Sequence, residues 1–206
     1  MKAAIPFLAL VLGSCGPAEQ KAPELKKVDE PAARPPPHSL ALSVVLEGGA
    51  KLGQNTFFKV RIRNISIREV DVVPSLDGSD VGWRYPLFTA RLWGPDGKPI
   101  LVDVGRCGNC NGLSKANVVA LKPDEEFDPL AGESFLGHTY LTDWTPKQVG
   151  KHRLVLTVDY SATDPAEWNG SEERIGADPK KVRDVLARVP LERMESTVEF
   201  EVTKQP

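Results

Sequence analysis

The stretch Phe58-Lys59-Val60-Arg61-Ile62-Arg63 places an apolar side chain at every second position and a basic side chain between them. Successive side chains of a β-strand point to opposite faces of a sheet, so this period of two predicts a strand with one buried and one solvated face. The same alternation recurs at residues 154–160 and at residues 198–202, where Glu199 and Glu201 occupy polar positions. Half-buried strands of this kind are typical of antiparallel sheets.

Further short strands are separated by clusters of Gly, Pro, Asn and Asp, which favour turns. The tightest hairpin is predicted at residues 94–97, Gly-Pro-Asp-Gly, where proline presets one backbone angle and glycine accepts an unusual one. Because strands do not alternate with helices, we expect an all-β fold, an antiparallel β-sandwich of immunoglobulin-like type, over residues 39–206. The additional strands are predicted at residues 40–47, 69–73, 87–93, 98–104, 117–121 and 135–141.

One short helix is predicted in the C-terminal region. Asp178 is a good capping residue, Pro179 suits the first helical position, and Pro190 ends the pattern. We expect the helix to cover part of the sandwich, and a partner-binding helix is the alternative. The apolar residues that would share one helical face are Val182, Val185, Leu186 and Val189.

The chain begins with the features of an export signal. Lys2 precedes an apolar run, residues 5–12, and small residues follow. The sequence Leu12-Gly13-Ser14-Cys15 resembles the bacterial lipobox, in which signal peptidase II cleaves before a cysteine modified by diacylglycerol. The resemblance implies that residues 1–14 are a lipoprotein signal peptide and that lipid on Cys15 anchors the mature chain to a membrane. A plain secretory signal or an apolar helix is the alternative, although the run is too short to span a bilayer.

A lipid anchor of this type would place the protein in the bacterial cell envelope. The several chains of a bacterial lipoprotein make attachment durable, whereas one chain binds only marginally. Gly16 stands where the inner-membrane retention signal of enteric bacteria usually carries Asp. The resemblance therefore implies the outer membrane if the host has one, and otherwise the surface of the cell membrane.

Residues 15–38 are predicted to be the lipidated cysteine followed by a disordered linker. Six prolines, four basic and four acidic side chains occupy residues 16–38, without apolar periodicity. A tether of this composition reaches up to roughly 70 Å where it is polyproline-like. Removal of residues 1–14 changes the formal net charge only from -2 to -3. This balance does not favour nucleic acid as a partner.

Four short segments of the predicted domain resemble immunoglobulin-like domains of bacterial envelope proteins. They are also weakly similar to the bacterial intracellular proteinase inhibitor domain, through a strand, an Asn-x-Ser turn and a late strand. The similarity concerns framework residues, which host many functions, and it identifies no inhibitory loop. The segments are residues 53–66, 94–97, 121–125 and 149–154.

Cys107 and Cys110 lie in a Gly/Asn-rich segment and are the only cysteines besides Cys15. Because an exported protein meets oxidising conditions, we predict a disulfide between them that restrains this connection. A redox site would require the pair at a helix N-terminus in a βαβ unit, and a metal site would require further ligands. Both remain alternatives, and no cofactor is predicted.

Residues 77–86 supply the binding candidates. Asp77 and Asp80 bracket a turn that could contribute to calcium binding, although such turns usually bond their own backbone. Trp83 and Tyr85 form the best candidate for an exposed aromatic cluster, and we expect their rings to pack against the loop that contains the two cysteines. We also expect at least two of the four tryptophans to lie in the core.

These features favour a non-catalytic, membrane-anchored envelope lipoprotein that displays a β-sandwich to another envelope protein or to a cell-wall polymer. A protease inhibitor or protective factor is the second hypothesis. A redox or metal-dependent enzyme is the third, and it would require free thiols of depressed pKa or a bound metal.

The disulfide hypothesis makes a direct prediction for Cys107→Ser. Loss of the cross-link should lower the melting temperature of the mature protein purified from the envelope, because the unfolded chain gains freedom. Thiol titration of the unfolded wild-type protein, lipidated on Cys15, should then detect no free thiol. An unchanged melting temperature together with two titratable thiols would contradict the disulfide.

Overall fold

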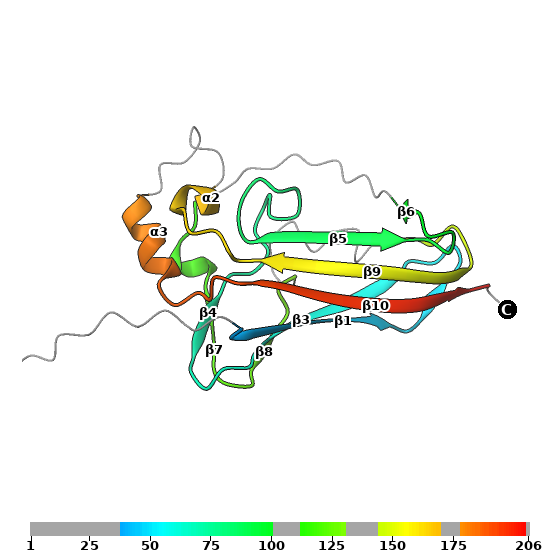
Figure 1. Cartoon of the computed structure of the whole chain (residues 1–206), viewed down its shortest axis with the longest axis horizontal. Coiled ribbons are helices and arrows are strands. Elements are labelled where there is room, and N and C mark those ends of the chain that lie inside the picture. The colour runs from blue at the N-terminus through cyan, green and yellow to red at the C-terminus, as the bar shows by residue number, and fades with distance from the viewer. Residues whose placement is uncertain (1–37, 101–111, 131–143, 170–177, 205–206) are drawn as a thin grey trace, which may run out of the picture. The chain divides into compact units, whose positions relative to one another are not determined.

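Two sheets form the body of the domain. A computed structural model describes residues 38–100, 112–130, 144–169 and 178–204, and all of them belong to the unit Pro31–Pro206. The larger sheet has the strand order β2-β10-β9-β5-β6, and the smaller has the order β1-β3-β8 (Figure 1). The strands of the larger sheet are β2 (Ala50–Lys51), β5 (Leu87–Trp93), β6 (Pro99–Ile100), β9 (Gly150–Asp159) and β10 (Arg193–Thr203).

The smaller sheet consists of β1 (Leu40–Glu47), β3 (Phe57–Asn64) and β8 (Glu126–Phe127). A separate two-stranded ladder joins β4 (Val70–Val72) to β7 (Val119–Leu121). Among the described strands, every pairing is antiparallel except that of β2 with β10, which is parallel. The described residues therefore confirm a mostly β fold built from antiparallel sheets.

The apolar positions of the alternating strands meet between the two sheets. Phe58 of β3 and Phe200 of β10 contact each other with ring centroids 5.4 Å apart, in an edge-on arrangement that aromatic rings favour. Val60 and Ile62 of β3 are buried, whereas Lys59 and Arg63, on the opposite face of the strand, are exposed. The period of two in the sequence thus corresponds to one core face and one solvent face.

Most predicted strands lie where the sequence placed them. The bounds of β1 and β5 agree with the prediction, and the hairpin at residues 94–97 joins β5 to β6, with Gly97 at φ +74°. The predicted strand at residues 117–121 begins only at Val119, because the side chain of Asn117 accepts the backbone N–H of Ser114 and closes a turn. The strand predicted at residues 135–141 lies outside the described residues, as does residue 101 onward of the strand predicted at 98–104.

The predicted helix is confirmed as α3 (Pro179–Leu186). The carboxylate of Asp178 accepts the backbone N–H of Lys180 at 2.9 Å, which caps the first turn. Val182, Val185 and Leu186 belong to the buried core cluster, and the helix lies beside α2 at one end of the sheets (Figure 1).

The expectation of one helix was wrong. A second helix, α2 (Pro165–Asn169), and a 3₁₀ turn, η1 (Lys115–Asn117), also occur. Helix α2 is too short for an apolar period to reveal it, and a tertiary contact fixes it. Trp168 is fully buried, and its indole N–H donates to the carbonyl of Ala162 at 3.1 Å. Trp144 is also buried, which confirms that at least two tryptophans belong to the core. None of the helices in the described ranges has the length and apolarity to cross a membrane.

Glu192 holds the first residues of the domain in place. Its Oε1 accepts the backbone N–H groups of Ser39 and Leu40, both at 3.0 Å. Burial raises the pKa of the Glu192 carboxyl, and the two backbone donors oppose that rise. The chain therefore enters the sheets at a point fixed beside the start of β10.

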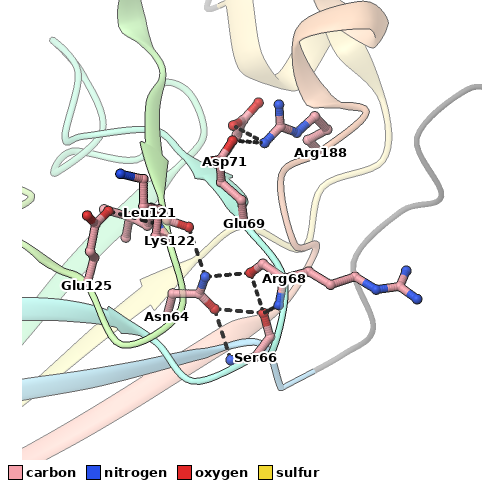
Figure 2. Close-up of polar contacts among 9 residues, drawn as sticks. All are labelled: Asn64, Ser66, Arg68, Glu69, Asp71, Leu121, Lys122, Glu125 and Arg188. Carbon is pink, nitrogen blue, oxygen red and sulfur yellow. Dashed lines mark hydrogen bonds and ion pairs between the residues drawn. The ribbon is translucent and has the colours of Figure 1, made fainter. Parts of the chain in front are cut away.

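A buried asparagine braces the loop that follows β3 (Figure 2). The amide Nδ2 of Asn64 donates to the carbonyl oxygens of Arg68 and Leu121, at 2.7 and 2.9 Å. Its Oδ1 accepts the backbone N–H and the hydroxyl of Ser66. Because all four bonds form inside the protein, the loop is held rigid while Ile67 at its tip stays 92% exposed.

Asn64→Asp should lower the free energy of unfolding by about 3 kcal/mol, because two buried carbonyl oxygens lose their donor and face a carboxylate. Denaturant unfolding of the mature protein measures this loss. Ile67→Ser in the same loop is the matched control and should change stability by less than about 0.5 kcal/mol. Equal effects of the two variants would refute the bracing role of Asn64.

Glu192→Gln tests the carboxyl that fixes the entry of the chain. A folded-state pKa raised above its ordinary value of 4.5 means that the contribution of Glu192 to stability is fully present below that pH. The contribution is lost as the pH rises through the folded-state pKa. Glutamine keeps the acceptor without titrating, so the melting temperature of the variant relative to wild type should increase from pH 4 to pH 8. A melting-temperature difference between Glu192→Gln and wild type that is the same at both pH values would contradict this role of Glu192.

Candidate functional site

The candidate site lies where the β5–β6 hairpin meets β9 and β10. The register places Trp93 of β5 opposite Arg153 of β9, and Arg153 opposite Glu199 of β10. In the next row, Lys151 of β9 lies opposite Glu201 of β10. Residues directly opposite one another in antiparallel strands share a face, so these five side chains project from one side of the sheet.

A cleft of about 470 Å³ opens over these rows. The two glycines of the hairpin, Gly94 and Gly97, form part of its wall and contribute no side chain to it. The other described lining residues are Trp93, Lys151, His152, Arg153, Glu199, Phe200 and Glu201. The volume lies in the range of small-molecule sites in proteins.

Arg153 is held against Trp93. Its guanidinium carbon lies 4.4 Å from the centre of the indole ring, within the distance of a cation–π contact. This contact restricts the side chain of Arg153 while leaving its N–H groups free to bind an acceptor. Arginine presents these donors in a planar fork that fits a carboxylate.

The remaining charges of the cleft form no ion pairs within the described part of the chain. Lys151, Glu199 and Glu201 are exposed, and none of them has an oppositely charged group within ion-pair distance there. A basic row on β9 therefore runs beside an acidic row on β10. Neighbouring strands lie about 4.8 Å apart, so both rows are within reach of one small ligand.

Buried aromatic side chains make the layer beneath the cleft rigid. His152 and Phe200 stack at 5.6 Å, and Trp144 contacts both rings at 5.5 and 5.8 Å. The Nδ1 of His152 lies 2.8 Å from the carbonyl oxygen of Gly150. These contacts fix the strands whose other face carries Lys151, Arg153 and Glu199.

The binding candidates taken from the sequence lie at the opposite end of β5. Trp83 is 47% exposed, whereas the ring of Tyr85 packs on Trp168 at 5.8 Å. The two aromatic rings therefore do not form one exposed cluster. The expected contact with the cysteine loop involves residues outside the described ranges.

Asp77 and Asp80 are partly buried in a turn with many backbone hydrogen bonds. The N–H of Leu76 donates to the hydroxyl of Ser79, whose own N–H donates to the carbonyl of Leu76. Both aspartates also interact with other groups of the protein. No three His, Cys, Asp or Glu side chains in the described ranges gather in a way that could hold a metal ion.

Cys15, the predicted lipidation site, and Cys107 and Cys110, the predicted disulfide, lie outside the described residues. The predicted signal peptide at residues 1–14 and residues 15–37 of the predicted linker also lie outside them. These expectations stay predictions.

The sequence did not identify the cleft, although it contains a partial signal. Glu199 and Glu201 were correctly placed on the polar face of a strand, and the hairpin after Trp93 was predicted. The alignment of three strands that are distant in sequence brings these residues together with Arg153, and a single strand pattern does not specify that alignment.

No family pattern and no curated protein sequence matches the chain. Among solved structures, the chain is similar to the CARDB domain of the PF1109 protein from Pyrococcus furiosus, in complex with di-metal ions. The TM-score is 0.33 with 16% sequence identity, and the match covers 81% of this chain and 94% of that one. The metal ions in that complex are a property of that protein.

Proposed function

We propose that this protein is a non-catalytic lipoprotein of the bacterial cell envelope, anchored through lipid on Cys15. Its described sheets form an immunoglobulin-like β-sandwich that presents the cleft at the β5–β6 hairpin to an envelope protein or a cell-wall polymer. Cys107 and Cys110 are joined by a disulfide in the oxidising envelope. The lipobox resemblance supports the proposed location in the cell envelope, and the position and chemistry of the cleft support the proposed binding role.

The observation that carries the proposal is the placement of the cleft at the end of the sheets opposite the entry of the chain. Glu192 fixes Ser39 and Leu40 beside the start of β10, whereas Glu199 and Glu201 of the cleft lie near the end of that strand (Figure 1). At about 3.4 Å per residue, the eight residues from Glu192 to Phe200 span roughly 27 Å. The cleft therefore lies at the end of the sheets remote from Ser39 and Leu40, where the described chain begins to pair.

The reach of the linker fits this arrangement. A chain rich in proline and charge, such as residues 16–38, extends rather than collapses and acts as a spacer. With the linker extended, the domain can search a layer several tens of ångströms deep above the membrane. Tethering also raises the effective concentration of the cleft near fixed envelope components, so a modest affinity is sufficient.

A protease inhibitor is the second candidate, and one observation favours it. The loop after β3 exposes Ile67 almost completely while Asn64 fixes the loop backbone from inside. A rigid exposed loop binds a protease without a large loss of conformational entropy. Purified protein that slows proteolysis, with the effect removed by Ile67→Asp, would support this candidate instead of the cleft.

Cys15→Ser tests the anchor. The variant cannot receive the lipid, and the lipobox resemblance implies that it is then not cleaved, so mass spectrometry of the purified protein should find residues 1–14 retained and no diacylglyceryl mass. The matched control is Cys107→Ser, which should lack residues 1–14 and carry the lipid on Cys15. The same cleaved and lipid-modified form in both variants would contradict lipid anchoring.

Site-specific photo-crosslinking tests the cleft. A photoreactive residue at position 151, in the cleft, should capture a recurrent envelope component in intact cells. The same residue at position 184, exposed on α3 at the other end of the sheets, is the control. Equal capture from both positions, or capture from position 184 alone, would overturn the assignment of the cleft as the binding surface.

A further inference from the structure

The charges of the cleft are separated by sign across two neighbouring strands. Lys151 and Arg153 are cationic and lie on β9, and Glu199 and Glu201 are anionic and lie on β10. Each cation is directly opposite an anion, yet no ion pair joins them. Both rows therefore retain their capacity to bind charged groups of a ligand.

From this separation of charge we propose that the cleft binds a short peptide that carries both a free carboxylate and a free ammonium group, as an uncrosslinked cell-wall stem peptide does. The inference rests on the proposed function and specifies the ligand of that site. The carboxylate lies on the guanidinium of Arg153 with Lys151 beside it, and the ammonium lies between Glu199 and Glu201.

The side chain of Arg153 is already held in one position before a ligand binds. Its stacking on Trp93 at 4.4 Å fixes a side chain that would otherwise lose conformational freedom on binding. A guanidinium held in this way can form two parallel hydrogen bonds to a carboxylate. A lysine at the same position would supply the charge but not the paired geometry.

The same contacts disfavour other ligands. A sugar ring that stacked on Trp93 would compete with Arg153 for the indole face. A purely anionic polymer would meet Glu199 and Glu201, and a purely cationic peptide would meet Lys151 and Arg153. Like charges brought together in this way cost binding energy, so only a ligand with both charges satisfies both rows.

The wall of the cleft suits a peptide backbone. Gly94 and Gly97 flank the site without side chains, so a chain can approach the hairpin closely. Gly97 has a φ of +74°, which favours glycine at this turn. A side chain at position 97 would strain the turn.

The test measures binding of the full mature protein to the tripeptide Ala-Glu-Lys with free termini, by titration calorimetry. The comparison peptide has an acetylated amino terminus, an amidated carboxyl terminus, and neutral Gln and Leu in place of Glu and Lys. A tetramer of N-acetylglucosamine is the sugar probe. We expect the charged tripeptide to bind, and its affinity to fall as salt is raised, because the contacts are charged and near the surface.

Arg153→Ala and Glu199→Gln should each reduce affinity for the charged tripeptide at least about tenfold, since each removes a charge-assisted contact. Glu195→Gln, on the same strand and the same face but outside the cleft, should leave the affinity unchanged. Arg153→Lys, which keeps the charge, should give an intermediate loss. Melting temperatures of all four variants establish that they are folded.

Equal binding of the charged and neutral peptides, or binding of the sugar alone, would overturn the inference. If no peptide binds while position 151 still captures an envelope protein, the ligand class is wrong and the proposed function stands. If neither occurs, the proposed function is wrong as well.

Discussion

The pairing of β9 with β10 is the constraint on which the rest of the structure depends. The two strands are aligned at ten consecutive positions, and β9 is aligned with β5 at seven more. Because side chains alternate between faces, a shift of one residue would turn the buried Leu154, Leu156 and Val158 to solvent and bury Arg153. The same register that forms the core therefore also builds the charged rows of the cleft.

Different interactions stabilise the two ends of the sheets. At the end where the chain enters, buried polar groups determine the backbone, since Glu192 accepts two N–H groups and Asn64 forms four hydrogen bonds. Arg188 adds an ion pair to Glu69 at 2.6 Å, with Asp71 close by (Figure 2). At the other end, stacked aromatic rings support a surface whose charges remain unpaired in the described chain. This is the surface that the proposed function assigns to a partner.

The proposed function gives a role to each end of the sheets. Glu192 fixes Ser39 and Leu40 at one end of the strands, and the cleft lies at the far end of the same strands. The loop after β3 also exposes Ile67 on a turn that Asn64 holds from inside. The display of rigid features on a tethered β domain requires no chemistry at the domain itself.

The sequence by itself determined the strand faces, the β5–β6 hairpin, the capped helix α3 and the mostly β class, because each depends on side chains within a few residues of one another. The tertiary structure alone decided helix α2, which a buried Trp168 holds, and the choice of Glu192 and Asn64 as internal hydrogen-bond partners. It also decided the cleft, since Trp93, Arg153 and Glu199 come from three strands between 46 and 106 residues apart in the chain. Local patterns specify which face a residue occupies, whereas only the register between distant strands specifies its neighbours on that face.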